Sequence, residues 1–216
     1  MFDGRVIFPD GDLYIGTGDA GDAAAADAFT GLAGKVLRVT DIGAAASDNP
    51  SGTPVWTRGH RTVPGLCSPV SSDPTSPPSL SAVLEVEPDA SGVGDVNLLS
   101  AGQRYGPSGL APVTTLPENM TAPGGCAILD GLLFVTSEDG QALLSAPLKT
   151  DTGMLEIGAW TTTLRGTYGR LLSVTAASDG SLWLTTTNRD GHGHPVADDE
   201  RVIRIVPDTS PAVSPA

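Results

Sequence analysis

A turn followed by a strand that bears an aromatic residue occurs three times in this 216-residue chain, and it limits the fold more than any other feature. The copies lie at residues 10–15, 130–135 and 179–184. Each begins with Asp-Gly and continues into apolar residues, a pattern typical of a turn that enters a β-strand. A polar turn and a second apolar stretch follow each copy. These second stretches lie at residues 35–39, 142–146 and 201–206. The repeating unit is therefore at least a β-hairpin.

The spacing of the copies predicts a β-propeller. The second and third copies are 49 residues apart, and the first and second are 120 apart. A four-stranded propeller blade takes about 40–50 residues, so the longer gap has room for one intervening blade with long loops. The chain supplies about four blades, whereas a closed ring of six needs roughly 270 residues. We therefore expect an all-β, partial propeller over residues 1–207, from a longer ring, and a disordered Pro/Ser/Ala-rich tail over 208–216.

Composition and charge agree with this fold and exclude two classes of partner. The 27 glycines and 18 prolines suit many short strands joined by turns. A formal net charge of −13 would repel a phosphate backbone, so we expect no nucleic-acid partner. No apolar run reaches the roughly 18 residues of a membrane span, and the first residues do not resemble a signal peptide.

The two cysteines bear on the compartment in which the chain folds. Cys67 and Cys126 each follow a Pro/Gly turn, and no further cysteine or nearby histidine supports a metal site. We interpret them as a disulfide, and two buried free thiols are the alternative. A disulfide predicts folding outside the cytoplasm, secreted or at the cell envelope, with an export signal upstream of this sequence.

Three other patterns have a functional and a structural interpretation. Residues 16–21 match the G-x-G-x-x-G dinucleotide-binding pattern, but no alternation of strands and helices follows, so we do not expect that site. His192 and His194 lack a third zinc ligand within reach and are expected to be solvated. An acidic stretch could ligate calcium, but its spacing favours an acidic loop surface. Its members are Asp19, Asp22 and Asp27.

The aromatic residues of the three repeats are expected to lie in the core. Tyr14, Phe134 and Trp183 occupy equivalent positions in the copies. Equivalent positions indicate a shared role in packing between blades rather than a sugar-binding platform.

Several further segments occur in an order that resembles a known family. In the first half they are residues 4–8, 10–21, 32–39 and 58–61. In the second half they are residues 168–171, 179–183, 188–191 and 198–204. Together they resemble the glucose/sorbosone dehydrogenase family of quinoprotein sugar dehydrogenases. The resemblance implies a six-bladed propeller that binds pyrroloquinoline quinone (PQQ) with calcium at one channel mouth and oxidises aldoses at the anomeric carbon. It also implies that a histidine takes the sugar hydroxyl proton, while hydride passes to the quinone and arginines hold its carboxylates.

The resemblance assigns site residues by position. The residues it implies for cofactor binding are Arg61, Thr62, Arg170 and Asn188. The residues it implies for calcium are Glu87 and Pro88, the latter through its backbone. Five positions depart from the family pattern. Met1 stands where the catalytic histidine is expected, Thr62 replaces an asparagine, and Leu172 replaces a second arginine. In the family's Glu-His/Gln-Gly-Pro stretch, Val86 replaces the histidine or glutamine and Glu87 replaces the glycine.

These matches and departures leave two functional hypotheses. The first is a PQQ-dependent aldose dehydrogenase domain whose active site is eroded or truncated, so that its catalytic residue is unknown and its activity uncertain. The second is a non-catalytic exported propeller that binds a carbohydrate or a protein at the cell envelope. The cysteine pair and the altered site resemble actinobacterial exported lipoproteins, which implies an upstream lipid anchor. An unclosed ring would also expose strand edges and favour self-association.

Overall fold

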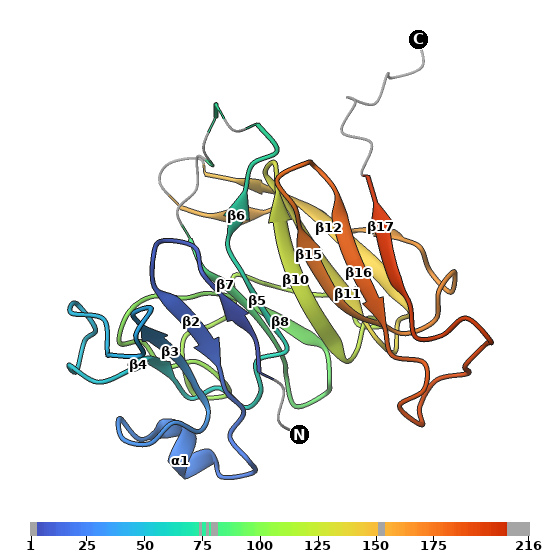
Figure 1. Ribbon diagram of the computed structural model, residues 1–216. Coiled ribbons are helices and arrows are strands. Elements are labelled where there is room, and N and C mark those ends of the chain that lie inside the picture. The colour runs from blue at the N-terminus through green and yellow to red at the C-terminus, as the bar shows by residue number, and fades with distance from the viewer. Residues whose placement is uncertain (1–3, 74, 77, 79–81, 151–153, 207–216) are drawn as a thin grey trace.

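The computed structural model describes residues 4–73, 75–76, 78, 82–150 and 154–206, and the tail expected over 208–216 lies outside them. The described residues form four β-sheets (Figure 1). The first contains, in order, β1 (Val6–Ile7), β2 (Leu13–Gly16), β3 (Lys35–Val39) and β4 (Val55–Arg58). The second contains β5 (Gly65–Cys67), β7 (Leu84–Pro88), β8 (Gly94–Leu98) and β9 (Thr114–Thr115).

The third and fourth sheets complete the described fold. The third runs from β6 (Pro69–Val70) through β10 (Pro123–Leu129), β11 (Leu132–Ser137) and β12 (Ala142–Lys149) to β13 (Glu156–Ile157). β14 (Thr161–Thr163) also pairs with β12. The fourth contains β15 (Leu171–Ala176), β16 (Leu182–Thr186) and β17 (Val202–Ile205). All pairs of neighbouring strands are antiparallel except β6 with β10.

The four sheets follow one another as the blades of a propeller. One strand of each sheet packs against its counterpart in the next, β1 against β5, β5 against β10, and β10 against β15 (Figure 1). Within the sheets, the predicted hairpins are present as β2–β3, β11–β12 and β16–β17. The expected all-β, partial propeller of about four blades is confirmed.

Apolar side chains fill the space between successive sheets, and a disulfide joins two of the sheets. One cluster lies between the first and second sheets, one between the second and third, and one between the third and fourth. Cys67 of β5 and Cys126 of β10 form the expected disulfide, and both are buried. The cross-link therefore ties neighbouring inner strands at the centre of the described fold.

The expectation of buried aromatic residues holds for two repeats and is wrong for the third. Tyr14 and Phe134 are 4% and 5% exposed, whereas Trp183 is 42% exposed. Phe134 packs in the cluster shared by the third and fourth sheets. Trp183 lies on the face of β16 opposite Leu182 and Leu184, and no further sheet of the described residues covers that face.

The G-x-G-x-x-G segment does not form a dinucleotide-binding unit. It leads from β2 into α1 (Ala23–Asp27), a helix of five residues, and the next strand, β3, runs antiparallel to β2. A dinucleotide-binding unit requires a longer crossover helix and a parallel strand. Among the described residues there is also no helix with the length and hydrophobicity of a membrane span.

The close approach of β10 and β15 depends on a glycine. A Cβ atom at Gly124 would lie 2.2 Å from the backbone oxygen of Leu172 and 2.6 Å from Oγ1 of Thr136. Its backbone φ is not positive, so the conflict is steric alone. We expect Gly124→Ala to lower the free energy of unfolding by about 1–3 kcal/mol, as overpacking does in other cores. Urea denaturation followed by circular dichroism measures this change. An unchanged midpoint would show that β10 and β15 can move apart to fit the added methyl group without loss of stability.

Candidate functional site

Loops from all four sheets meet at one end of the fold around a cleft of about 840 Å³. The charged side chains that line it are Asp19, Arg61, Asp89, Glu138, Asp139 and Arg170. Carboxylates therefore outnumber guanidinium groups in the lining. The cleft brings together four of the six residues assigned to cofactor and calcium. These are Arg61, Thr62, Pro88 and Arg170, whereas Glu87 and Asn188 do not line it.

Arg61 and Thr62 lie in the loop between β4 and β5, which is anchored through its backbone. The N–H of Arg61 donates to Oε2 of Glu87 at 3.1 Å, and its carbonyl accepts from the N–H of Asp19 at 2.9 Å. The Arg61 side chain is exposed and forms no hydrogen bond or ion pair with another described residue. Thr62 Oγ1 is buried and has no hydrogen-bond partner among the described residues. Arg61 is therefore the unused donor that the cleft presents on a fixed backbone.

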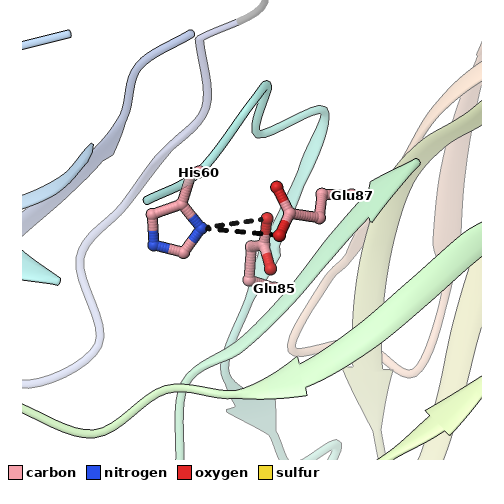
Figure 2. Close-up of side chains that lie close together, drawn as sticks. All are labelled: His60, Glu85 and Glu87. Carbon is pink, nitrogen blue, oxygen red and sulfur yellow. Dashed lines mark ion pairs between the residues drawn. The ribbon is translucent and has the colours of Figure 1, made fainter. Parts of the chain in front are cut away.

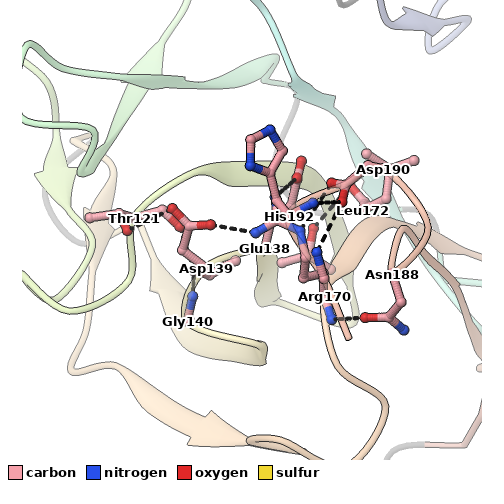
Figure 3. Close-up of polar contacts among 12 residues, drawn as sticks. Thr121, Glu138, Asp139, Gly140, Arg170, Leu172, Asn188, Asp190 and His192 are labelled. Carbon is pink, nitrogen blue, oxygen red and sulfur yellow. Dashed lines mark hydrogen bonds and ion pairs between the residues drawn. The ribbon is translucent and has the colours of Figure 1, made fainter. Parts of the chain in front are cut away.

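Arg170, by contrast, is fully engaged by carboxylates of its own chain (Figure 3). Its Nη2 donates to Glu138 at 2.7 Å, its Nε donates to Asp190 at 3.1 Å, and its Nη1 donates to Asp139. The side chain is 9% exposed. Burial alone would lower the pKa of Arg170, but Asp139 and the neighbouring acids outweigh it and raise the pKa above its usual value. Each guanidinium nitrogen of Arg170 therefore already donates to a carboxylate, and these surrounding negative charges oppose the binding of an anionic ligand.

Asn188 holds the backbone of Arg170 through a hydrogen bond. Its Oδ1 accepts from the backbone N–H of Arg170 at 2.8 Å, and its Nδ2 donates to the carbonyl of Tyr168 at 2.8 Å. A Cβ atom at Gly169 would lie 2.1 Å from Asn188 Oδ1, so the intervening residue has to be glycine. Asn188 is 3% exposed, and the structure gives it a position that fixes the turn before β15.

Glu87 and Pro88 end β7 and differ in their access to the cleft. Pro88 lines the cleft. Glu87 is buried, and its carboxylate lies beside His60 and beneath the backbone of Arg61. Both residues assigned to calcium line a neighbouring hollow beside Arg61, but only Pro88 also lines the cleft.

A buried cluster of His60, Glu85 and Glu87 was not foreseen from the sequence (Figure 2). Glu85 and Glu87 lie two residues apart on β7, and that spacing places both on one face of a strand. Burial raises the pKa of each carboxyl to about 8, with Asn97 opposing the shift at Glu85. Burial also lowers the pKa of His60 to about 4. The only sequence signal was this two-residue spacing of acids inside an apolar strand.

His192 is exposed, as expected from the sequence, and it is also a cleft residue to which sequence reasoning gave no role. It lines the cleft from the loop between β16 and β17, and its backbone N–H donates to Oδ1 of Asp190 at 2.8 Å. His194, its expected solvated neighbour, does not line the cleft. Of the three histidines in the chain, His192 is therefore the one that a ligand in the cleft would meet.

Comparison with known proteins identifies the family. The model of the family described as glucose / sorbosone dehydrogenase matches residues 1–115, which is more than half of the chain. The chain belongs to the glucose/sorbosone dehydrogenase family. No curated protein gives a significant match in a direct sequence search.

Solved structures of relatives share this propeller. The PQQ-bound form of an aldose sugar dehydrogenase from Streptomyces coelicolor matches 94% of the chain at 32% identity and a TM-score of 0.81. An oxidoreductase from Thermus thermophilus, described as a glucose dehydrogenase, matches 94% at 34% identity and the same TM-score. The apo-form of the soluble aldose sugar dehydrogenase from Escherichia coli, at 20% identity and a TM-score of 0.66 over 84% of the chain, shares the fold. The chain spans 61%, 64% and 60% of these relatives' lengths, respectively.

Proposed function

We propose that this chain forms the cofactor-binding side of a PQQ-dependent aldose dehydrogenase propeller. The observation that carries the proposal is the convergence of Arg61, Thr62 and Pro88 on one cleft, from the loop between β4 and β5 and from the end of β7. PQQ carries carboxylates, so its site needs donors that the protein does not already use. Arg61 meets that requirement because its guanidinium is exposed at the cleft and pairs with no other described residue, so the residues present fit the group.

Each of these residues has a distinct role in the proposal. Arg61 would bind a cofactor carboxylate, Thr62 would form the cleft wall beside it, and the Pro88 carbonyl would be an oxygen ligand for calcium. When bound, the quinone supplies the hydride acceptor for sugar oxidation. Nε2 or Nδ1 of His192 would accept the proton of the sugar hydroxyl, because His192 is the histidine that lines the cleft. Arg170 would organise the acidic wall rather than contact the cofactor.

A second candidate function is a non-catalytic propeller that binds a carbohydrate or a protein. The observation that favours it is the engagement of all the guanidinium nitrogens of Arg170 by Glu138, Asp139 and Asp190. An acidic cleft with carboxylates in excess suits sugar hydroxyls or a cationic partner at least as well as a polycarboxylate. In either case we infer an extracytoplasmic location, supported by the disulfide.

Titration with PQQ in the presence of calcium, followed by absorbance, tests the first candidate. We expect saturable binding by the folded protein, and a 10- to 150-fold weaker affinity for Arg61→Ala, since a hydrogen bond to a charged group contributes about 1.5–3 kcal/mol. Arg204→Ala is the matched control because Arg204 lies outside the cleft, on β17. It should leave the affinity unchanged.

The outcomes separate the two candidates. No binding by folded wild-type protein would reject the cofactor role and favour the non-catalytic propeller. Binding followed by sugar-dependent reduction of an artificial electron acceptor would reject the non-catalytic role. A selective loss of that reduction in His192→Gln, with PQQ affinity retained, would support His192 as the proton acceptor.

A further inference from the structure

The buried cluster of His60, Glu85 and Glu87 has the arrangement of a metal site (Figure 2). One potential ligand atom from each residue lies within 4.8 Å of the other two. Nδ1 of His60 is 3.5 Å from Oε1 of Glu85 and 4.0 Å from Oε1 of Glu87. The side chains of His60 and Glu85 are wholly buried, and that of Glu87 is 4% exposed. The cluster lies in the protein interior, where an uncompensated pair of carboxylates is costly.

Two of these atoms have no hydrogen-bond partner in the part of the chain that the structure describes. Nδ1 of His60 and Oε1 of Glu85 are buried and unsatisfied, and they lie 3.5 Å apart. Buried polar atoms are satisfied in the great majority of cases, so such a convergence is typical of a site that binds an ion or a water molecule. Lys35, the nearby buried cation, does not compensate the cluster through its hydrogen bonds, because its Nζ donates to the carbonyls of Ala25, Ala26 and Ala33.

The remaining atoms of the three side chains are held by outer partners. Nε2 of His60 is hydrogen-bonded to Oγ1 of Thr57 at 2.8 Å. Oε2 of Glu85 accepts from Nδ2 of Asn97 at 2.7 Å, and Oε2 of Glu87 accepts from the N–H of Arg61 at 3.1 Å. Metal-ligating histidines and carboxylates are oriented in this way, with one atom on the metal and the other on a fixed partner.

We propose that His60, Glu85 and Glu87 bind a divalent transition-metal ion of the Zn²⁺ type beneath the cleft. One imidazole nitrogen and two carboxylate oxygens are a ligand set that Zn²⁺ accepts, whereas Ca²⁺ and Mg²⁺ prefer oxygen alone. The ion neutralises the two buried carboxylates. With three protein ligands, the fourth tetrahedral position takes a water molecule.

The site has an entry path and a consequence for the cleft. Glu87 lines a neighbouring hollow of about 480 Å³ together with Arg61, Pro88 and Asp95, so an ion reaches the cluster from that side. Binding closes the ligand atoms toward the roughly 2 Å metal distances of such sites and draws the loop that carries His60 and Arg61 onto β7. The ion is distinct from any calcium at Pro88 because it needs no atom from the cleft.

Metal binding to the purified, chelator-treated chain tests the proposal. We expect one tightly bound Zn²⁺ per chain by calorimetry and elemental analysis, not displaced by excess Ca²⁺. Co²⁺ in its place should give a visible absorption spectrum, and X-ray absorption of the Zn²⁺ form should show one imidazole in the coordination shell. These measurements use the unmodified chain, so they stand even if a variant fails to fold. A folded wild-type chain that binds no Zn²⁺ overturns the proposal.

Variants locate the ion within the chain. Glu85→Gln and His60→Gln are expected to abolish the tight site, and Asn97→Ala, which removes an outer partner, to weaken it about 10- to 100-fold. The double variant His192→Ala and His194→Ala is the control for a surface site in the loop between β16 and β17. If that double variant lost the ion while Glu85→Gln retained it, the binding would belong to the surface loop and the proposal would be wrong.

Discussion

Replacing Cys67 and Cys126 together by alanine is expected to lower the free energy of unfolding by about 3–4 kcal/mol. The disulfide closes a loop with a sequence separation of 59 residues, and removing it restores the conformational freedom of that loop in the unfolded chain. Both cysteines are buried between inner strands, so the alanines also leave apolar contacts unmade. The effect is large against the 5–15 kcal/mol of a typical domain.

Guanidinium denaturation with and without a reductant measures this difference. The wild-type midpoint should fall on reduction, and the double-alanine variant should have the same midpoint in both conditions. Alkylation of both thiols in the native, non-reduced protein would contradict the disulfide, and with it the argument for folding outside the cytoplasm.

Local patterns in the sequence were sufficient to predict the hairpins. At most one residue separates each Asp-Gly turn from the strand that follows it, β2, β11 or β16. Such hairpins are predictable because the conformation of a turn and the alternation of a strand depend on a few neighbouring residues. The exposure of Trp183 could not be predicted from such local patterns. Its strand was predicted, but its exposure depends on whether another sheet covers β16, and no local pattern contains that.

The candidate site was predictable by position and not by chemistry. The family resemblance placed Arg61, Thr62 and Arg170 at one mouth of the propeller, and the structure brings them to one cleft. The state of Arg170 depends on Glu138 and Asp139, which lie about 30 residues earlier and on another sheet. Such long-range pairs form only when the sheets pack, so a residue-by-residue match could not distinguish a free arginine from an engaged one.

Replacing Arg170 by leucine is expected to lower the free energy of unfolding by about 2–4 kcal/mol. Removing one partner from a buried ion pair costs about 3–5 kcal/mol, and the partial exposure of the carboxylates reduces the loss here. Arg170→Lys should lower the free energy of unfolding by roughly half as much. An ammonium keeps the charge but lacks the planar guanidinium fork that reaches three carboxylates at once. Arg204→Leu is the control, because its ion pair with Asp179 is about half exposed and contributes at most about 1 kcal/mol.

The pH dependence of this loss identifies its cause. Burial pushes the pKa of Asp190 upward, but the backbone N–H of His192 and the charge of Arg170 outweigh it and lower the pKa below its usual value. A carboxyl with a lowered pKa stabilises the fold above its unfolded pKa and loses that contribution as pH falls through the folded value. The difference between wild type and Arg170→Leu should therefore be full at pH 7 and shrink below about pH 4. If the difference stayed constant with pH, the loss of stability would come from altered packing at residue 170 rather than from the lost ion pairs. PQQ affinity in the same variant is a separate measurement. A normal affinity would place Arg170 in the wall of the cleft and leave Arg61 as the carboxylate-binding residue.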